Sequence, residues 1–142
     1  MSPVLDRAAI QQILPHRDPF LFVDEVVELV PRQRVVGVLR IPEAGFFQRG
    51  AAKDDPCFPA TLLIEAMAQV GAILVLHPKE NRGRTIYFRA IDQARFHQQV
   101  PTGATLRIEG IVRRIRGRLG TLQMSAFLQD ALAAEGLMTF AL

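Results

Sequence analysis

The chain has 142 residues, 49% of them hydrophobic, so its length suits one domain with a buried core and is short for two. Its 17 basic residues exceed its 14 acidic residues by three, which favours an acidic partner. We find no helix-turn-helix pattern, zinc-ligand spacing or aromatic-rich RNA-binding signature, so nucleic acid is not an expected partner. The single cysteine, Cys57, excludes an intrachain disulfide and fits the reducing cytoplasm, where we expect the protein to act.

The first third of the chain predicts a short helix, a hairpin and a loop. Apolar spacing over residues 6–14 is typical of a helix, and the prolines of PHRDPF end it. Residues 20–30 and 34–41 are rich in β-branched and aromatic side chains and predict two paired strands. Residues 45–59 lose this pattern and predict a loop.

Residues 59–76, PATLLIEAMAQVGAILVL, are apolar on nearly every face and predict a central helix that other elements surround. Two polar residues interrupt the run, which falls short of the roughly 20 apolar residues of a membrane span, so no membrane is expected. Residues 85–142 alternate with the two-residue period of strands and predict an antiparallel meander of four strands. The predicted class is α+β, one twisted sheet around one long helix.

The two polar residues in the apolar helix are the strongest functional signal. Glu65 and Gln69 are four residues apart and therefore share one face of the helix. A charged carboxylate in apolar surroundings is costly unless it is paired or opens to a cleft. A structural role beside a backbone group or an arginine is the alternative, but we favour a functional acid.

The start of the same helix is a second candidate feature. The amides of Ala60 and Thr61 lie in the first turn, where free N–H groups can bind a developing oxyanion. Combined with an acid one turn further on, such amides suit chemistry next to a carbonyl, such as loss or addition of water at a thioester. The three histidines, His16, His77 and His97, fall in a turn, at a helix end and after a strand, where surface or capping roles are more common.

Four segments together resemble a known family. LPHRDPFLFVDEV, then FF, then PATLLIEAMAQVGAIL, then AIDQARFHQQVPTGATLRIEG, occur in the order found in the 3-hydroxyacyl-acyl carrier protein dehydratases of fatty-acid synthesis. The resemblance implies a hot-dog fold in one domain, residues 1–142, with a long central helix wrapped by a twisted antiparallel sheet. It also implies that two protomers pair and continue one sheet across the dimer, with each active site built from both chains.

The family's substrate is a 3-hydroxyacyl thioester on acyl carrier protein, an acidic partner that the arginines late in this chain would attract. A loop histidine removes a proton from C2, and a helix acid protonates the departing C3 hydroxyl. Glu65 matches the acid, and Ala60 and Thr61 match the helix-start amides, although the family commonly has glycine at the Ala60 position. Gln69 and Phe88 are predicted to contact the substrate. No cofactor or metal is expected.

The loop histidine itself is missing. The family places it fourteen residues before the acid, which corresponds to Ala51, and no histidine occurs between Phe46 and Glu65. Three replacements are possible: an aspartate at 54 or 55, His16 from its turn, or a histidine from a partner subunit. Three functions therefore stay open: a dehydratase with an altered base, a non-catalytic binding subunit that acts only beside a catalytic relative, and a hot-dog thioesterase. We expect a homodimer or higher oligomer, with a heterodimer with a catalytic relative as the alternative.

Overall fold

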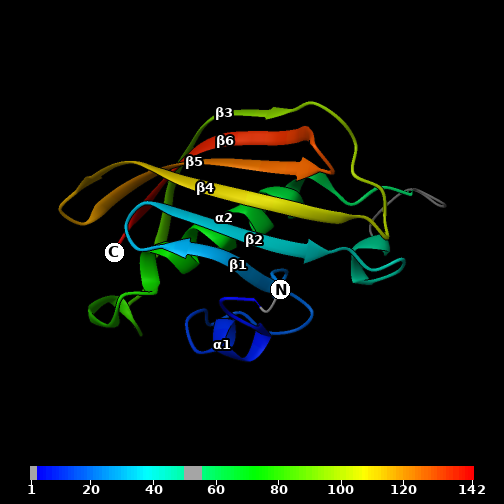
Figure 1. Ribbon diagram of the computed structural model, residues 1–142. Coiled ribbons are helices and arrows are strands. Elements are labelled where there is room, and N and C mark those ends of the chain that lie inside the picture. The colour runs from blue at the N-terminus through cyan, green and yellow to red at the C-terminus, as the bar shows by residue number, and fades with distance from the viewer. Residues whose placement is uncertain (1–2, 50–55) are drawn as a thin grey trace.

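The computed structural model describes residues 3–49 and 56–142 (Figure 1). Its helices and strands follow the predicted order of a short helix, a hairpin, a long helix and four strands. They are α1 (Arg7–Gln11), β1 (Glu25–Val30), β2 (Arg34–Arg40), α2 (Ala60–Leu76), β3 (Tyr87–Phe96), β4 (Thr105–Arg116), β5 (Leu119–Leu128) and β6 (Ala131–Ala141), with 3₁₀ turns at Phe46–Gln48 and Lys79–Asn81. The position of the missing histidine, Ala51, lies outside the described residues, as do the aspartates at 54 and 55.

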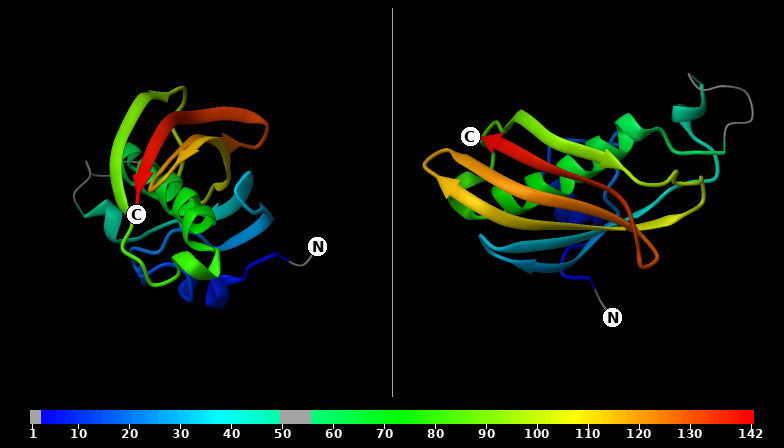
Figure 2. Two further views of the ribbon diagram at one scale, coloured as in Figure 1. Left: turned by 90° about the vertical axis from the view of Figure 1, so that its left-hand side faces the viewer. Right: turned by 90° about the horizontal axis from the view of Figure 1, so that it is seen from above.

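One antiparallel sheet contains all six of these strands, in the order β1-β2-β4-β5-β6-β3. The sheet curls around α2, which lies along its concave face (Figure 2). The helix packs mainly on β2, β4 and β5, the middle of the sheet. The predicted architecture of one long helix wrapped by a twisted antiparallel sheet is therefore confirmed.

The prediction of a four-strand meander is wrong in one respect. β3 does not pair with β4; it crosses to the far edge and pairs with β6. The connection after Phe96 is not a tight turn, because it passes the start of α2, where the Phe58 amide donates to the carbonyl of Val100 at 2.8 Å. The Ile41 amide then donates to the Ala104 carbonyl at 2.9 Å. This bond places the start of β4 beside β2, with which β4 pairs.

The prediction that the first strand begins at residue 20 is also wrong, since β1 begins at Glu25. Residues 20–22 are not paired with a strand because a side chain takes up their backbone groups. The amide nitrogen of Gln69 donates to the Phe20 carbonyl at 2.9 Å, and its oxygen accepts from the Phe22 N–H at 2.9 Å. The side chain of Gln69 thus makes the backbone hydrogen bonds that a neighbouring strand would otherwise make.

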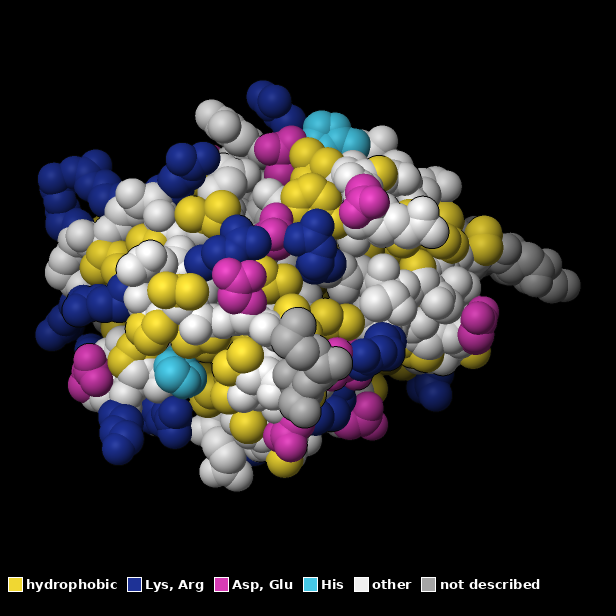
Figure 3. Space-filling model, in the orientation of Figure 1, with side chains coloured by type: hydrophobic (Ala, Val, Ile, Leu, Met, Phe, Trp, Pro, Cys, Tyr) yellow, Lys and Arg dark blue, Asp and Glu magenta, His cyan; other side chains and the backbone are white. Residues whose placement is uncertain are grey.

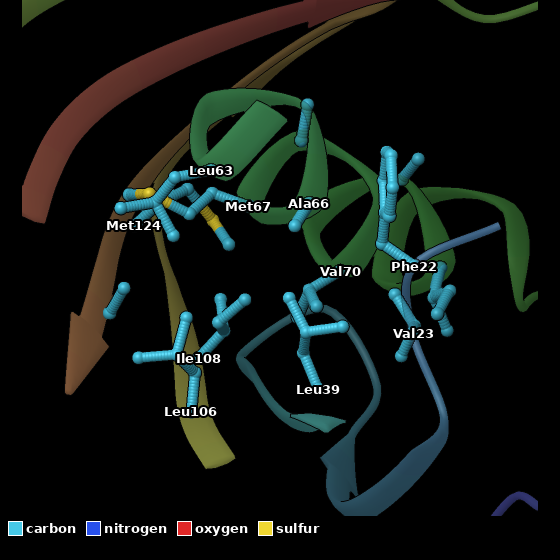
Figure 4. Packing of buried hydrophobic residues seen from close by; sticks show 14 of the residues in the cluster. Phe22, Val23, Leu39, Leu63, Ala66, Met67, Val70, Leu106, Ile108 and Met124 are labelled. Carbon is cyan, nitrogen blue, oxygen red and sulfur yellow. The ribbon is translucent and has the colours of Figure 1, made fainter. Parts of the chain in front are cut away.

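α2 is buried along most of its length, as its sequence predicts. Figure 4 shows Leu63, Met67 and Val70 of this helix directed at Leu39, Leu106, Ile108 and Met124 of the sheet. Gly71 permits a close approach, since a Cβ there would lie 2.9 Å from Cζ of Phe140. No helix in the described part of the chain is both long and apolar enough to cross a membrane.

The two edges of the sheet differ. The outer edge of β1 is partly covered, because the amides of Val4 and Leu5 donate to the Val26 carbonyl at 2.8 and 3.1 Å. β3, the other edge, is exposed at nine of its ten positions, including Phe88, Ile91 and Phe96. A long edge strand with exposed apolar side chains is a site for pairing with another chain.

Candidate active site

Glu65 lies on α2 with its carboxylate half-buried, 30% exposed, and held by its neighbour one turn on. Nε2 of Gln69 donates a hydrogen bond to Oε1 of Glu65 at 3.0 Å. Gln69 is only 1% exposed, and its amide also bonds the backbone of Phe20 and Phe22. The acid is therefore oriented by an amide that is itself fixed to the loop before β1.

Glu65 opens into a hollow of about 130 Å³ between α2 and the start of β3. Phe88 lines this hollow and stacks on Phe140, with ring centroids 5.3 Å apart and planes 14° from parallel. Gln69 also lines it. The structure thus brings together three of the predicted site residues, an acid, an amide and an aromatic wall, although contact of Gln69 and Phe88 with a substrate stays a prediction.

The structure places His16 beside Glu65, whereas its place in a turn of the sequence favoured a surface or capping role. Its side chain, 28% exposed, lines the same hollow, and Nε2 lies 3.5 Å from Oε1 of Glu65. The two residues are 49 positions apart, so no local pattern reveals the contact. The one available signal is that His16 belongs to the LPHR segment that carries part of the family resemblance.

The start of α2 lies in a separate and larger hollow, of about 680 Å³. Ala60 and Thr61 line it together with Phe96 at the end of β3. The amides of Leu62 and Leu63 both donate to the Pro59 carbonyl, at 3.1 and 3.0 Å, so the Ala60 and Thr61 amides precede the helical ladder. Among the described residues, this hollow shares no lining residue with the Glu65 hollow, so the helix start and the acid of one chain face different hollows.

The other two histidines do not line the Glu65 hollow of their own chain. His77 follows the last residue of α2, twelve residues beyond the acid and about 18 Å along the helix axis. His97 lines the helix-start hollow and binds Glu135 through Nε2 at 2.7 Å. Glu135 alternates along β6 with the buried residues Ala134 and Gly136 and so projects from the outer face of the sheet. The described residues contain no group of three His, Cys, Asp or Glu side chains placed to hold a metal ion.

Gln69 is expected to stabilise the fold as well as orient the acid. Replacing Gln69 with alanine leaves the buried Phe22 N–H and Phe20 carbonyl without their partner, and each such loss costs about 1–3 kcal/mol. We expect the free energy of unfolding, measured by chemical denaturation, to fall by at least about 2 kcal/mol. The matched control is Gln33→Ala, at an exposed turn position, which should change it by less than about 0.5 kcal/mol. Equal effects of the two variants would contradict the assigned role of Gln69.

Comparison with known proteins identifies the class. Residues 14–136 match the family described as FabA-like domain, and the chain belongs to that family. Relatives include 3-hydroxyacyl-[acyl-carrier-protein] dehydratase FabZ of Desulforamulus reducens, 45% identical over 139 residues, covering 98% of each chain. The protein of the same name from Bacillus cereus strain AH820 is 41% identical, covering 98% of this chain and 96% of its own. The family predicted from the sequence is confirmed.

Solved structures agree on the fold. The dehydratase heterocomplex ApeI:P from Xenorhabdus doucetiae matches with a TM-score of 0.79 at 16% identity, covering 99% of this chain and 91% of that one. An uncharacterized protein from Pyrococcus horikoshii matches with a TM-score of 0.71 at 12% identity, covering 99% and 94%. These likenesses confirm the hot-dog fold.

Proposed function

We propose that the protein eliminates water from a (3R)-3-hydroxyacyl thioester on acyl carrier protein to form a 2-enoyl thioester. The observation that carries the proposal is Glu65, held by Gln69 in the wall of a hollow beside Phe88, in a chain 45% identical to a named dehydratase of this type. Glu65 protonates the C3 hydroxyl as it departs. The amides of Ala60 and Thr61 hold the thioester carbonyl, where negative charge develops when the C2 proton is lost.

The position of β3 supports this assignment of roles in a proposed dimer that pairs through this strand. β3 runs between the two hollows, with Phe96 at the helix-start hollow and Phe88 at the Glu65 hollow. In a two-fold dimer with antiparallel pairing of the two β3 strands, the Phe96 end of one protomer lies beside the Phe88 end of the other. The helix start of one chain then faces the acid of its partner, and the exposed apolar residues of β3 become buried.

The proposed partner is an acyl carrier protein in the cytoplasm. The chain carries a net charge of +3, and Arg113, Arg114, Arg116 and Arg118 are all exposed near the β4–β5 turn. Figure 3 shows Lys and Arg side chains projecting from this end of the sheet, on the left of the view. Exposed basic residues of this kind steer an acidic carrier toward the protein and speed their association.

The test is to incubate the purified protein with a 3-hydroxyacyl thioester on acyl carrier protein and to follow enoyl thioester and free thiol together. Enoyl formation without thiol release is the expected result. Free thiol without enoyl would replace the proposal with thioester hydrolysis. Turnover that begins only after addition of a relative with the loop histidine would show that the chain works in a mixed dimer and not alone.

A further inference from the structure

Within one chain, His16 is the histidine of the three that lies at the proposed acid. Its Nε2 is 3.5 Å from Oε1 of Glu65, whereas His77 lies at the far end of α2, and His97 lines the separate helix-start hollow with its Nε2 bonded to Glu135. Among the described residues, Nδ1 of His16 is buried and has no hydrogen-bond partner. Proton exchange by the ring therefore runs through Nε2, the nitrogen that faces Glu65.

The turn that carries His16 is held firmly. Arg17 donates from Nη1 to the carbonyls of Leu14 and His16, at 2.9 and 2.6 Å, and from Nη2 to the carbonyl of Gln11 at 3.1 Å. Leu14 before the turn and Leu21 after it are 1% and 3% exposed, so both flanks are anchored in the core. A side chain on such a braced turn keeps its distance from the acid, as a catalytic group must.

We propose that His16 is the base of the reaction, in place of the absent loop histidine; this inference rests on the proposed dehydration. Before elimination, Glu65 carries a proton and Nε2 of His16 does not. Nε2 takes the proton from C2, the C2–C3 double bond forms as the C3–O bond breaks, and Glu65 gives its proton to the departing hydroxyl. The products are the enoyl thioester and water, and the site holds an imidazolium beside a carboxylate.

The short distance between Nε2 of His16 and Oε1 of Glu65 lets the two groups return directly to their protonation states before elimination. Transfer of one proton from Nε2 to Oε1 restores the neutral imidazole and the protonated acid without a proton from solvent. The distance also suits the elimination, because the C2 hydrogen and the C3 hydroxyl are on adjacent carbons. A base and an acid 3.5 Å apart in one hollow can each contact one of these groups when both lie on the same face of the substrate.

The test compares His16→Ala and His16→Gln with the unmodified protein. The amide nitrogen of glutamine reaches the position of Nε2 and can still donate a hydrogen bond to Glu65, but it cannot take a proton from carbon. If His16 is the base, both variants lose about 10²–10⁴-fold in kcat with little change in KM, and added imidazole restores part of the activity of His16→Ala. A positioning role predicts instead that His16→Gln keeps most of the activity. His77→Ala is the matched histidine control and should be unchanged.

A second substrate separates the base from the acid. A 3-chloroacyl thioester loses chloride, which needs no proton, so after subtraction of the uncatalysed rate its elimination depends on the base alone. We expect His16→Ala to fail on both substrates and Glu65→Ala to fail only on the hydroxyl substrate. Far-ultraviolet circular dichroism and thermal unfolding check that the variants fold.

The outcomes distinguish this inference from the proposed function. Full dehydration by folded His16→Ala and His16→Gln would overturn the role of His16 and leave the dehydratase standing, with its base elsewhere. Retained chloride elimination by His16→Ala would do the same. Absence of enoyl product from the unmodified protein with either substrate would overturn both.

Discussion

Replacing Glu65 with alanine is expected to lower kcat for dehydration by about 10²–10⁴-fold, the usual contribution of a positioned general acid. The hydroxyl is a poor leaving group unless it is protonated as the C–O bond breaks. The hollow beside Phe88 offers this carboxylate, held at 3.0 Å by Gln69, as the group for that step. Steady-state kinetics with a 3-hydroxyacyl thioester measures the loss, which should fall on kcat rather than on KM.

Glu65→Gln provides the sharper control for the same residue. Its side-chain oxygen can still accept the hydrogen bond from Gln69, so packing is kept while the proton is lost. It should therefore be as inactive as Glu65→Ala but at least as stable. Glu80→Ala removes an exposed carboxylate beyond the end of α2 and should leave kcat unchanged. A Glu65→Gln protein with near-normal turnover would exclude Glu65 as the proton donor.

Glu65 could be predicted from the sequence because an isolated carboxylate stands out in an apolar run. The start of α2 could also be predicted, since Pro59 and the following apolar residues place the first turn at Ala60. Such features depend on residues that are close in sequence. The fold class followed for the same reason, from the periodicity of each segment and the order of the segments.

The remaining features depend on contacts between distant residues. Contact of Gln69 with substrate stays a prediction. Its amide bonds the backbone of Phe20 and Phe22, nearly 50 positions earlier, and these bonds explain why β1 does not begin at residue 20, as the pattern of residues 20–30 predicts. The approach of His16 to Glu65 requires the same loop to fold back on α2. Alternation within β3 and β4 gives no information on which strands are neighbours, so the crossing of β3 to β6 was missed.

The position of β3 has a consequence for the active site. A meander would pair β3 with β4, whereas the observed order places β3 beyond β6, with its outer edge between the helix-start hollow and the Glu65 hollow. The two halves of the proposed site are separate in one chain and adjacent in a dimer that pairs through this edge. Two inactive variants should therefore complement each other.

The complementation uses Glu65→Ala and Ala60→Pro. Proline at the first helical position removes one of the two N–H groups proposed to bind the thioester oxygen. It nevertheless suits a helix start, and Pro59 already has the extended backbone, φ −60° and ψ 137°, that a residue before proline requires. Loss of one such donor should lower kcat by about 10²–10³-fold. Each variant alone is thus expected to be folded, dimeric and nearly inactive.

A heterodimer with one Glu65→Ala chain and one Ala60→Pro chain, isolated through two different affinity tags, is expected to recover about half of the unmodified activity. One of its two sites combines the intact helix start of the first chain with the intact Glu65 of the second, and the other site carries both defects. If each site were built within a single chain, both sites would be defective and the heterodimer would stay inactive. Recovery therefore requires that the acid and the carbonyl-binding amides of one site come from different protomers.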